Sequence, residues 1–189
     1  MDLPWGEKSS LFASSIGLIT STGKLGDNVM TCEWTHMISY KPGLIAVCIG
    51  PNKTTAENIR KTKEFGVNLC ADDMSAFSSV AGNNHGNQVN KIKVLEELGF
   101  KFYQGKKIKA RMIEGTVLNV ECKLVEEQVY GDHILFVGEA LEASVNENKQ
   151  LMIYHKTKYW KLGENVLKLD EKQVSEIKKI TEKHKNNLG

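Results

Sequence analysis

Residues 118–143 read LNVECKLVEEQVYGDHILFVGEALEA and decide the fold class. In the first part of this stretch apolar residues alternate with polar ones, which is typical of a β-strand with one buried face. The apolar members are Leu118, Val120, Cys122 and Leu124. Tyr130–Asp132 then turns the chain, and apolar residues resume over Ile134–Ala143. The stretch therefore predicts a long antiparallel hairpin.

Further strands are predicted on both sides of the hairpin, where short apolar runs lie between turn residues. Residues 44–49 form the longest apolar run, and a Pro-Gly pair before it and a Gly-Pro pair after it predict a fully buried strand. The other predicted strands span residues 11–22, 28–34, 65–71, 152–154 and 158–162.

Helical spacing is confined to a few short segments. The predicted helices span residues 55–63, 72–80, 88–98 and 170–185. In the last of these, Val174, Ile177 and Ile180 form an apolar stripe that is predicted to be a packing face rather than a partner site. Strands outnumber helices and do not alternate with them, which predicts a mainly β protein: an antiparallel closed or split barrel with helices at its ends.

The composition excludes several classes of protein. The chain has 189 residues, with 25 basic and 23 acidic side chains, so its net charge of +2 is too balanced for a protein that coats nucleic acid. No apolar run approaches the roughly 18 residues of a membrane-spanning helix, and residues 1–8 lack the pattern of a signal peptide. We therefore expect a cytoplasmic protein with neither a nucleic-acid nor a membrane partner.

The four cysteines predict no metal site. They are Cys32, Cys48, Cys70 and Cys122. None belongs to a C-x-x-C pair, which zinc knuckles and thioredoxin-type motifs require. Without a secretory signal, reduced and buried thiols are expected.

The segment Lys53-Thr54-Thr55 follows a predicted strand and a Gly-Pro turn, at the predicted start of a helix. It is not a P-loop, because Asn52 precedes the lysine where that motif requires glycine. A helix N-terminus nevertheless offers free N–H groups and a partial positive charge. A lysine and two hydroxyls beside it suit a phosphate group; the alternative is a capped helix with a solvated lysine.

Two further features have both a functional and an ordinary interpretation. The strand Asn28–Trp34 places a methionine and a tryptophan beside amide and hydroxyl groups, which suits a planar aromatic ligand or is simply a strand. His133 follows the Gly131-Asp132 turn. It either shapes the turn or donates a hydrogen bond to a bound cofactor.

Seven motifs in order resemble the flavin reductase-like family, the flavoredoxin-type FMN-binding split barrels. They span Ile16–Thr22, Asn28–Trp34, Pro42–Gly50, Lys53–Ile59, Phe65–Leu69, Gly131–Ala140 and Tyr154–Gly163. The resemblance covers a domain at residues 8–163 and leaves 164–189 as a C-terminal helical extension. It implies a homodimer with one FMN per chain near the subunit interface. Family members take hydride from NADH or NADPH and pass electrons to free flavin, iron complexes or a redox partner protein.

The resemblance also assigns roles to individual residues. The residues that it assigns to the flavin are Asn28, Val29, Met30, Thr31, Cys32, Lys53, Thr54, Thr55, Asn68, Tyr154, His155 and Trp160. In this set Lys53-Thr54-Thr55 holds the phosphate, and the last three come from the far end of the chain or the second subunit. His133 and Cys48 are assigned to the nicotinamide. Residues 82–87 depart from the Ser/Gly-Arg loop of many members, which leaves the NADH or NADPH preference open.

Two functions follow from the resemblance. The first is an NAD(P)H-dependent flavin or ferric reductase. The alternative is a flavoredoxin-like FMN electron carrier that does not oxidise nicotinamide directly. A use of the barrel without FMN is disfavoured, because Lys53-Thr54-Thr55 retains the phosphate chemistry.

Overall fold

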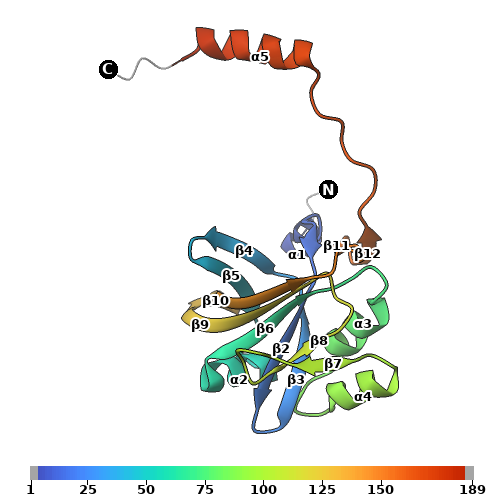
Figure 1. The fold of residues 1–189 in the computed structure, drawn as a ribbon. Coiled ribbons are helices and arrows are strands. Elements are labelled where there is room, and N and C mark those ends of the chain that lie inside the picture. The colour runs from blue at the N-terminus through green and yellow to red at the C-terminus, as the bar shows by residue number, and fades with distance from the viewer. Residues whose placement is uncertain (1–3, 186–189) are drawn as a thin grey trace.

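A computed structural model describes residues 4–185, and one large antiparallel sheet dominates it (Figure 1). Its strand order is β3-β2-β6-β9-β10-β5-β4. The strands are β2 (Gly17–Gly23), β3 (Gly26–Cys32), β4 (Thr35–Tyr40), β5 (Gly43–Ile49), β6 (Glu64–Leu69), β9 (Leu118–Tyr130) and β10 (His133–Val145). The sheet curls until Cys32 Sγ in β3 lies 3.3 Å from the Cys48 carbonyl oxygen in β5. The chain is therefore a mainly β split barrel, as the sequence predicts.

The predicted hairpin is the centre of this sheet. β9 and β10 pair antiparallel, with Ile134 opposite Val129, and each then pairs outward, β9 with β6 and β10 with β5. Gly138 sits at a register shift in the hairpin. A Cβ there would come within 2.5 Å of the Phe65 ring, so glycine lets the ring pack against the strand.

Two small sheets complete the strands. One contains β1 (Ser14–Ser15), β11 (Met152–His155) and β12 (Lys158–Lys161); the other pairs β7 (Phe102–Gln104) with β8 (Arg111–Ile113). The sequence did not predict β4, β7 or β8. β7 and β8 have only three residues each. Most side chains of the edge strand β4 are exposed, so its sequence lacks the alternation that marks a buried face.

Three helices cover the barrel on two sides: α2 (Thr54–Thr62), α3 (Ser75–Asn83) and α4 (Lys91–Glu97). The other helices of the described residues, α1 (Trp5–Ser9) and α5 (Glu171–Lys183), contain no buried residue. β2 supplies Ile19 to a core cluster shared with α2, and its neighbour Leu18 to a second cluster shared with α3 and α4. Because successive side chains of a strand point to opposite faces, β2 and β3 lie between these two layers. Within residues 4–185, no helix is long and apolar enough to cross a membrane.

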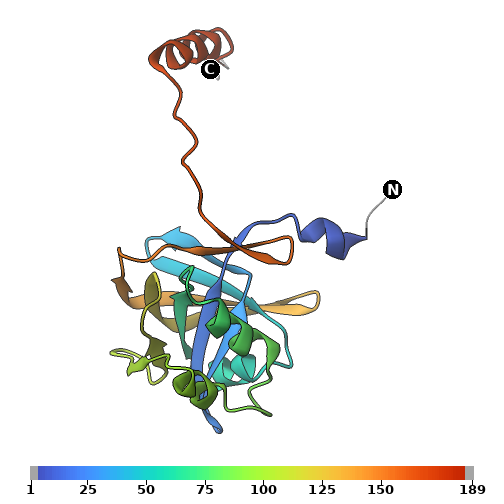
Figure 2. The same ribbon diagram turned by 90° about the vertical axis from the view of Figure 1, so that its right-hand side faces the viewer.

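The C-terminal helix corrects one prediction. Asp170 and Gln173 form a capping box at the start of α5, so the helix itself is as predicted. However, Val174, Ile177 and Ile180 are 51%, 49% and 50% exposed, and no residue of α5 is buried. An extended segment carries the helix away from the barrel (Figures 1 and 2). The prediction that this stripe packs against the rest of the chain is therefore wrong.

Candidate functional site

The start of α2 is held against β3. Thr55 is buried in the first turn of α2, and its Oγ1 accepts a 2.8 Å hydrogen bond from Nδ2 of the buried Asn28. Lys53 is the N-cap residue, and its own N–H donates to the Gly50 carbonyl in the preceding turn. The free N–H groups of a helix start therefore lie beside β3, as the strand–turn–helix order of the sequence predicts.

A cavity of about 70 Å³ opens at this junction. One wall comes from β3 and the start of α2: Asn28, Met30, Thr31, Lys53, Thr54 and Thr55. The opposite wall is the end of α3, residues 84–86 of the following loop and Lys91 of α4. The structure therefore brings together six of the residues that the sequence analysis assigns to the flavin.

Lys91 gives this cavity an unusual charge. It is only 3% exposed, and its Nζ donates a 3.0 Å hydrogen bond to the Ala81 carbonyl. Within residues 4–185 no carboxylate forms an ion pair with it. Burial, and secondarily the nearby charge of Lys53, lower the pKa of the Lys91 ammonium to about 8. A buried cation without a counter-ion is costly, and an anion in the cavity would compensate it.

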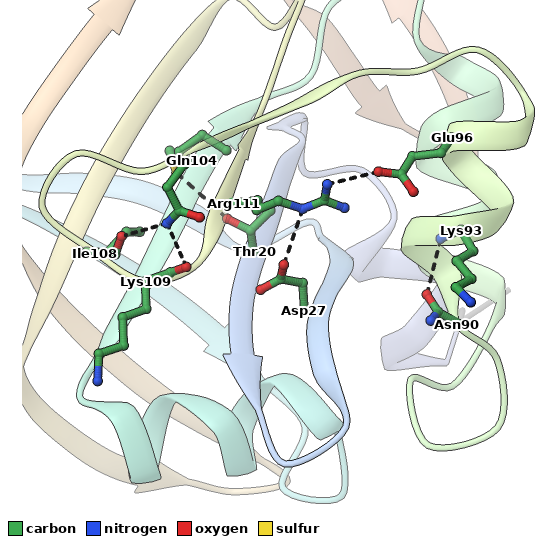
Figure 3. Close-up of polar contacts among 10 residues, drawn as sticks. Thr20, Asp27, Asn90, Lys93, Glu96, Gln104, Ile108, Lys109 and Arg111 are labelled. Carbon is green, nitrogen blue, oxygen red and sulfur yellow. Dashed lines mark hydrogen bonds and ion pairs between the residues drawn. The ribbon is translucent and has the colours of Figure 1, made fainter.

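The surrounding contacts fix α4, and with it Lys91, against β3 (Figure 3). Arg111 of β8 approaches Asp27 of β3 at 3.2 Å through Nε and Glu96 of α4 at 2.9 Å through Nη1. At the other end of α4, the Asn90 side chain accepts a hydrogen bond from the Lys93 N–H. Arg111 therefore links α4, the helix that carries Lys91, to β3, while the Asn90 cap fixes where that helix begins.

Lys91 and His85, the two other basic residues of the cavity, were not predicted from the sequence. A signal for Lys91 was present, because it lies four residues before the buried Leu95 and next to the buried Ile92. A lysine on the apolar face of a short helix indicates a buried charge. For His85, a histidine in a loop rich in glycine and asparagine, no such signal exists.

A second cavity of about 240 Å³ shares Thr31 and Gly82 with the first. It lies between β3, α3 and the β11–β12 hairpin, and two tyrosines of that hairpin, Tyr154 and Tyr159, line it. Tyr159 donates a 3.2 Å hydrogen bond to Ser78 Oγ, and the two tyrosine rings are 5.8 Å apart. The two cavities therefore run along β3 from a cationic end to a wider end with aromatic and hydroxyl groups.

A separate corner contains the residues that the sequence analysis assigns to the nicotinamide. The His133 and Trp34 rings lie 4.5 Å apart, and the Cys48 N–H donates a 3.0 Å hydrogen bond to the Trp34 carbonyl. His133 Nδ1 is 2.7 Å from Asp132 Oδ1. Burial raises the pKa of the Cys48 thiol, so this thiol stays protonated at neutral pH and is a neighbour rather than a nucleophile.

The remaining assigned residues lie elsewhere. Asn68 is fully buried in the barrel, where its amide bonds the Leu18 carbonyl, the Ile113 N–H and the Asn119 side chain. These bonds tie strands together, and Asn68 lines neither cavity. Val29 and Cys32 are buried in the two core clusters, while His155 and Trp160 contact one another on the β11–β12 hairpin.

The fold and the site together indicate which class of protein this is. A split barrel with a cationic cavity at a helix start, continued by a wider cavity, suits a phosphorylated ligand with a ring system. The particular family follows from comparison with known proteins: residues 9–163 match the model of the flavin reductase like domain, and the chain belongs to this family. The resemblance seen in the sequence is thereby confirmed.

Individual relatives are similar at modest identity. An uncharacterised Pyrococcus abyssi protein is 31% identical over 120 residues, covering 64% of this chain and 67% of that protein. The NAD(P)H ferric-chelate reductase of Archaeoglobus fulgidus is 27% identical over 118 residues, covering 62% and 67%. The solved NADH:FAD oxidoreductase of Streptomyces globisporus shares the fold, with a TM-score of 0.77 at 18% identity, covering 85% and 92%.

Proposed function

We propose that this chain binds FMN and transfers hydride from NADH or NADPH to flavin. The observation that carries the proposal is the buried ammonium of Lys91, which lacks a carboxylate partner within residues 4–185 and lines the same small cavity as Lys53 and the start of α2. A phosphate supplies the missing negative charge there. Membership of a flavin reductase family, with relatives named for NAD(P)H-dependent reduction, supports flavin as the rest of the ligand.

The residues present fit FMN. Lys53, Lys91 and the hydroxyls of Thr54 and Thr55 would hold the phosphate, and the second cavity, beyond Thr31, would take the ring system. Flavin, when bound, supplies a ring nitrogen that accepts hydride. Hydride transfer requires two stacked rings and the exclusion of water rather than an acid–base pair, so the work of the protein is to position them.

Separate groups of the chain are suited to the flavin and to the nicotinamide. Thr31 Oγ1 lies 2.7 Å from the Ser78 carbonyl and donates its proton to it, so towards a ligand Thr31 can only accept a hydrogen bond. The Trp34 and His133 rings form a partly exposed aromatic corner at the entrance to β10. We assign this corner to docking of the nicotinamide, with free flavin, an iron complex or a redox protein as the electron acceptor.

A comparison of FMN with riboflavin tests the phosphate assignment. We expect the apoprotein to bind FMN at least about tenfold more tightly than riboflavin, because one charge-assisted hydrogen bond contributes roughly 1.5–3 kcal/mol. Quenching of flavin fluorescence measures both affinities. The double variant with Lys53→Ala and Thr55→Ala should bind FMN and riboflavin with more similar affinities. Equal affinities for the two flavins in the unmodified protein would refute the assignment.

A further inference from the structure

Residues 82–87 were predicted to be a loop, but 82 and 83 are the last residues of α3 and only 84–87 belong to the loop before α4. This segment, which we call the 82–87 loop, lines one side of the phosphate cavity. Its members Asn84, His85 and Gly86 line the wall opposite Lys53. Gly86 approaches β3 and α2 so closely that a Cβ on it would lie 2.3 Å from Asn28 Oδ1 and 3.1 Å from Thr54 Cβ. The loop backbone therefore packs directly against side chains of both elements, and a Cβ at this point would force the loop or Asn28 to shift.

This contact separates two cavities. Beyond it lies a third cavity of about 180 Å³, and the two cavities share Asn28, Thr54 and Gly86 as their common wall. On the other side, the phosphate cavity continues along Thr31 and Gly82 into the wider cavity with the tyrosines. A ligand that extends from the wider cavity through the phosphate cavity therefore meets the contact of Gly86 with Asn28 and Thr54.

The charge of the cavity favours the same kind of ligand. A terminal phosphate monoester carries close to two negative charges at neutral pH. Each phosphate of a dinucleotide's pyrophosphate has lost one ionisable oxygen to the bridge, so it carries about one charge. Lys53 and the buried Lys91 together supply two positive charges at one small cavity. The Gly86 contact and the two cations therefore both match a monoester that terminates the ligand.

We propose that the 82–87 loop makes this chain specific for the mononucleotide FMN over the dinucleotide FAD, with Gly86 as the specificity-determining residue. The proposal rests on the proposed function, because it assumes that flavin phosphate occupies the cavity. FAD would have to displace the contact of Gly86 with Asn28 and Thr54 to place its second phosphate and adenosine. The fold alone does not impose this choice, since a solved NADH:FAD oxidoreductase shares it.

Parallel titrations of the apoprotein with FMN, FAD and riboflavin test the proposal. FAD must force the packed loop away from Asn28 and Thr54, so it should bind at least about tenfold more weakly than FMN. FAD within about threefold of FMN would overturn the specificity while leaving the phosphate assignment intact, provided that riboflavin binds weakly. If FMN and riboflavin bind equally, or no flavin binds, the proposed function itself fails.

The variant Gly86→Ala tests the residue. Its Cβ must push the loop away from Asn28, so FMN affinity should fall and the ratio of FMN to FAD affinity should decrease by about tenfold or more. Gly43→Ala is the matched control, because a Cβ there meets only Ala140 Cβ at an ordinary 3.6 Å. An unchanged ratio of FMN to FAD affinity in a folded Gly86→Ala variant would show that Gly86 does not determine the specificity. Thermal unfolding of both variants establishes that they fold.

Discussion

A single residue, Lys91, makes the stability of the folded protein depend on pH. Its pKa in the folded protein is about 8, below its ordinary value of 10.5, so between these values the unfolded chain binds more protons than the folded one. The free energy of unfolding therefore rises with pH through this window because of Lys91. The buried thiols act in the opposite direction above pH 9, because burial raises the pKa of Cys32 to about 11.

Replacement of Lys91 separates these contributions. Lys91→Met lacks the lysine contribution but keeps the thiols. The free energy of unfolding of the wild type, minus that of the variant, should therefore increase as pH rises from 8 to 10.5. Urea unfolding of the apoproteins across this range measures the difference. Lys93→Met, on the exposed side of the same helix, should follow the wild-type profile. A pH-independent difference between wild type and Lys91→Met would contradict the buried-charge assignment.

Replacement of His133 tests whether this residue positions the nicotinamide or only shapes the turn. Its Nδ1 bonds the Asp132 carboxylate, so Nε2 is the ring nitrogen left to form a hydrogen bond with the carboxamide of nicotinamide. His133→Ala should keep its FMN affinity and melting temperature. Flavin reduction should slow by about tenfold, because a hydrogen bond of ~1.4 kcal/mol is lost.

Stopped-flow mixing of the FMN-loaded protein with NADH and with NADPH measures this rate. Rapid bleaching in the wild type favours the reductase over the electron carrier, which would leave bound flavin oxidised. His184→Ala, at an exposed histidine that ends α5, is the control and should reduce flavin at the wild-type rate. Loss of stability in His133→Ala at an unchanged rate of flavin reduction would support the turn-shaping alternative.

At the scale of elements, prediction succeeded where the signal was local. The β9–β10 hairpin combines alternation with a Gly-containing turn, and both are visible within one stretch of chain. β4 was missed because its exposed residues Met37, Ile38 and Tyr40 hide any alternation, and only pairing with β5 makes the segment a strand. The periodicity of α5 predicted a helix but could not tell what covers its apolar face.

The same distinction applies to the elements of the site. Lys53-Thr54-Thr55 was predictable because a strand, a turn and a helix start follow one another in the sequence. Lys91 joins the same cavity from α4, through packing of α4 on β3 that no local window contains. Asn68 lies in a motif of the family, yet its bonds to three neighbouring segments only became visible in three dimensions.

At the scale of the whole molecule, apolar surface remains uncovered by the chain itself. Met37, Ile38 and Tyr40 are more than half exposed on β4, which is also an unpaired sheet edge. The C-terminal helix does not cover them, because α5 has no buried residue and stands away from the barrel (Figure 2). Exposed edges and large apolar patches are features that a second subunit commonly covers.

We therefore predict that the chain is a homodimer at micromolar concentration, with β4 in the interface. Sedimentation velocity should show a species of twice 21.1 kDa. Ile38→Lys should shift the protein to the monomer, because an unpaired charge buried in an interface is strongly unfavourable. Leu98→Lys replaces an equally exposed leucine at the end of α4, far from β4, and should remain dimeric (Figure 1). A flavin-loaded wild type that sediments only at 21.1 kDa would rule out the dimer, and a dimeric Ile38→Lys would place the interface away from β4.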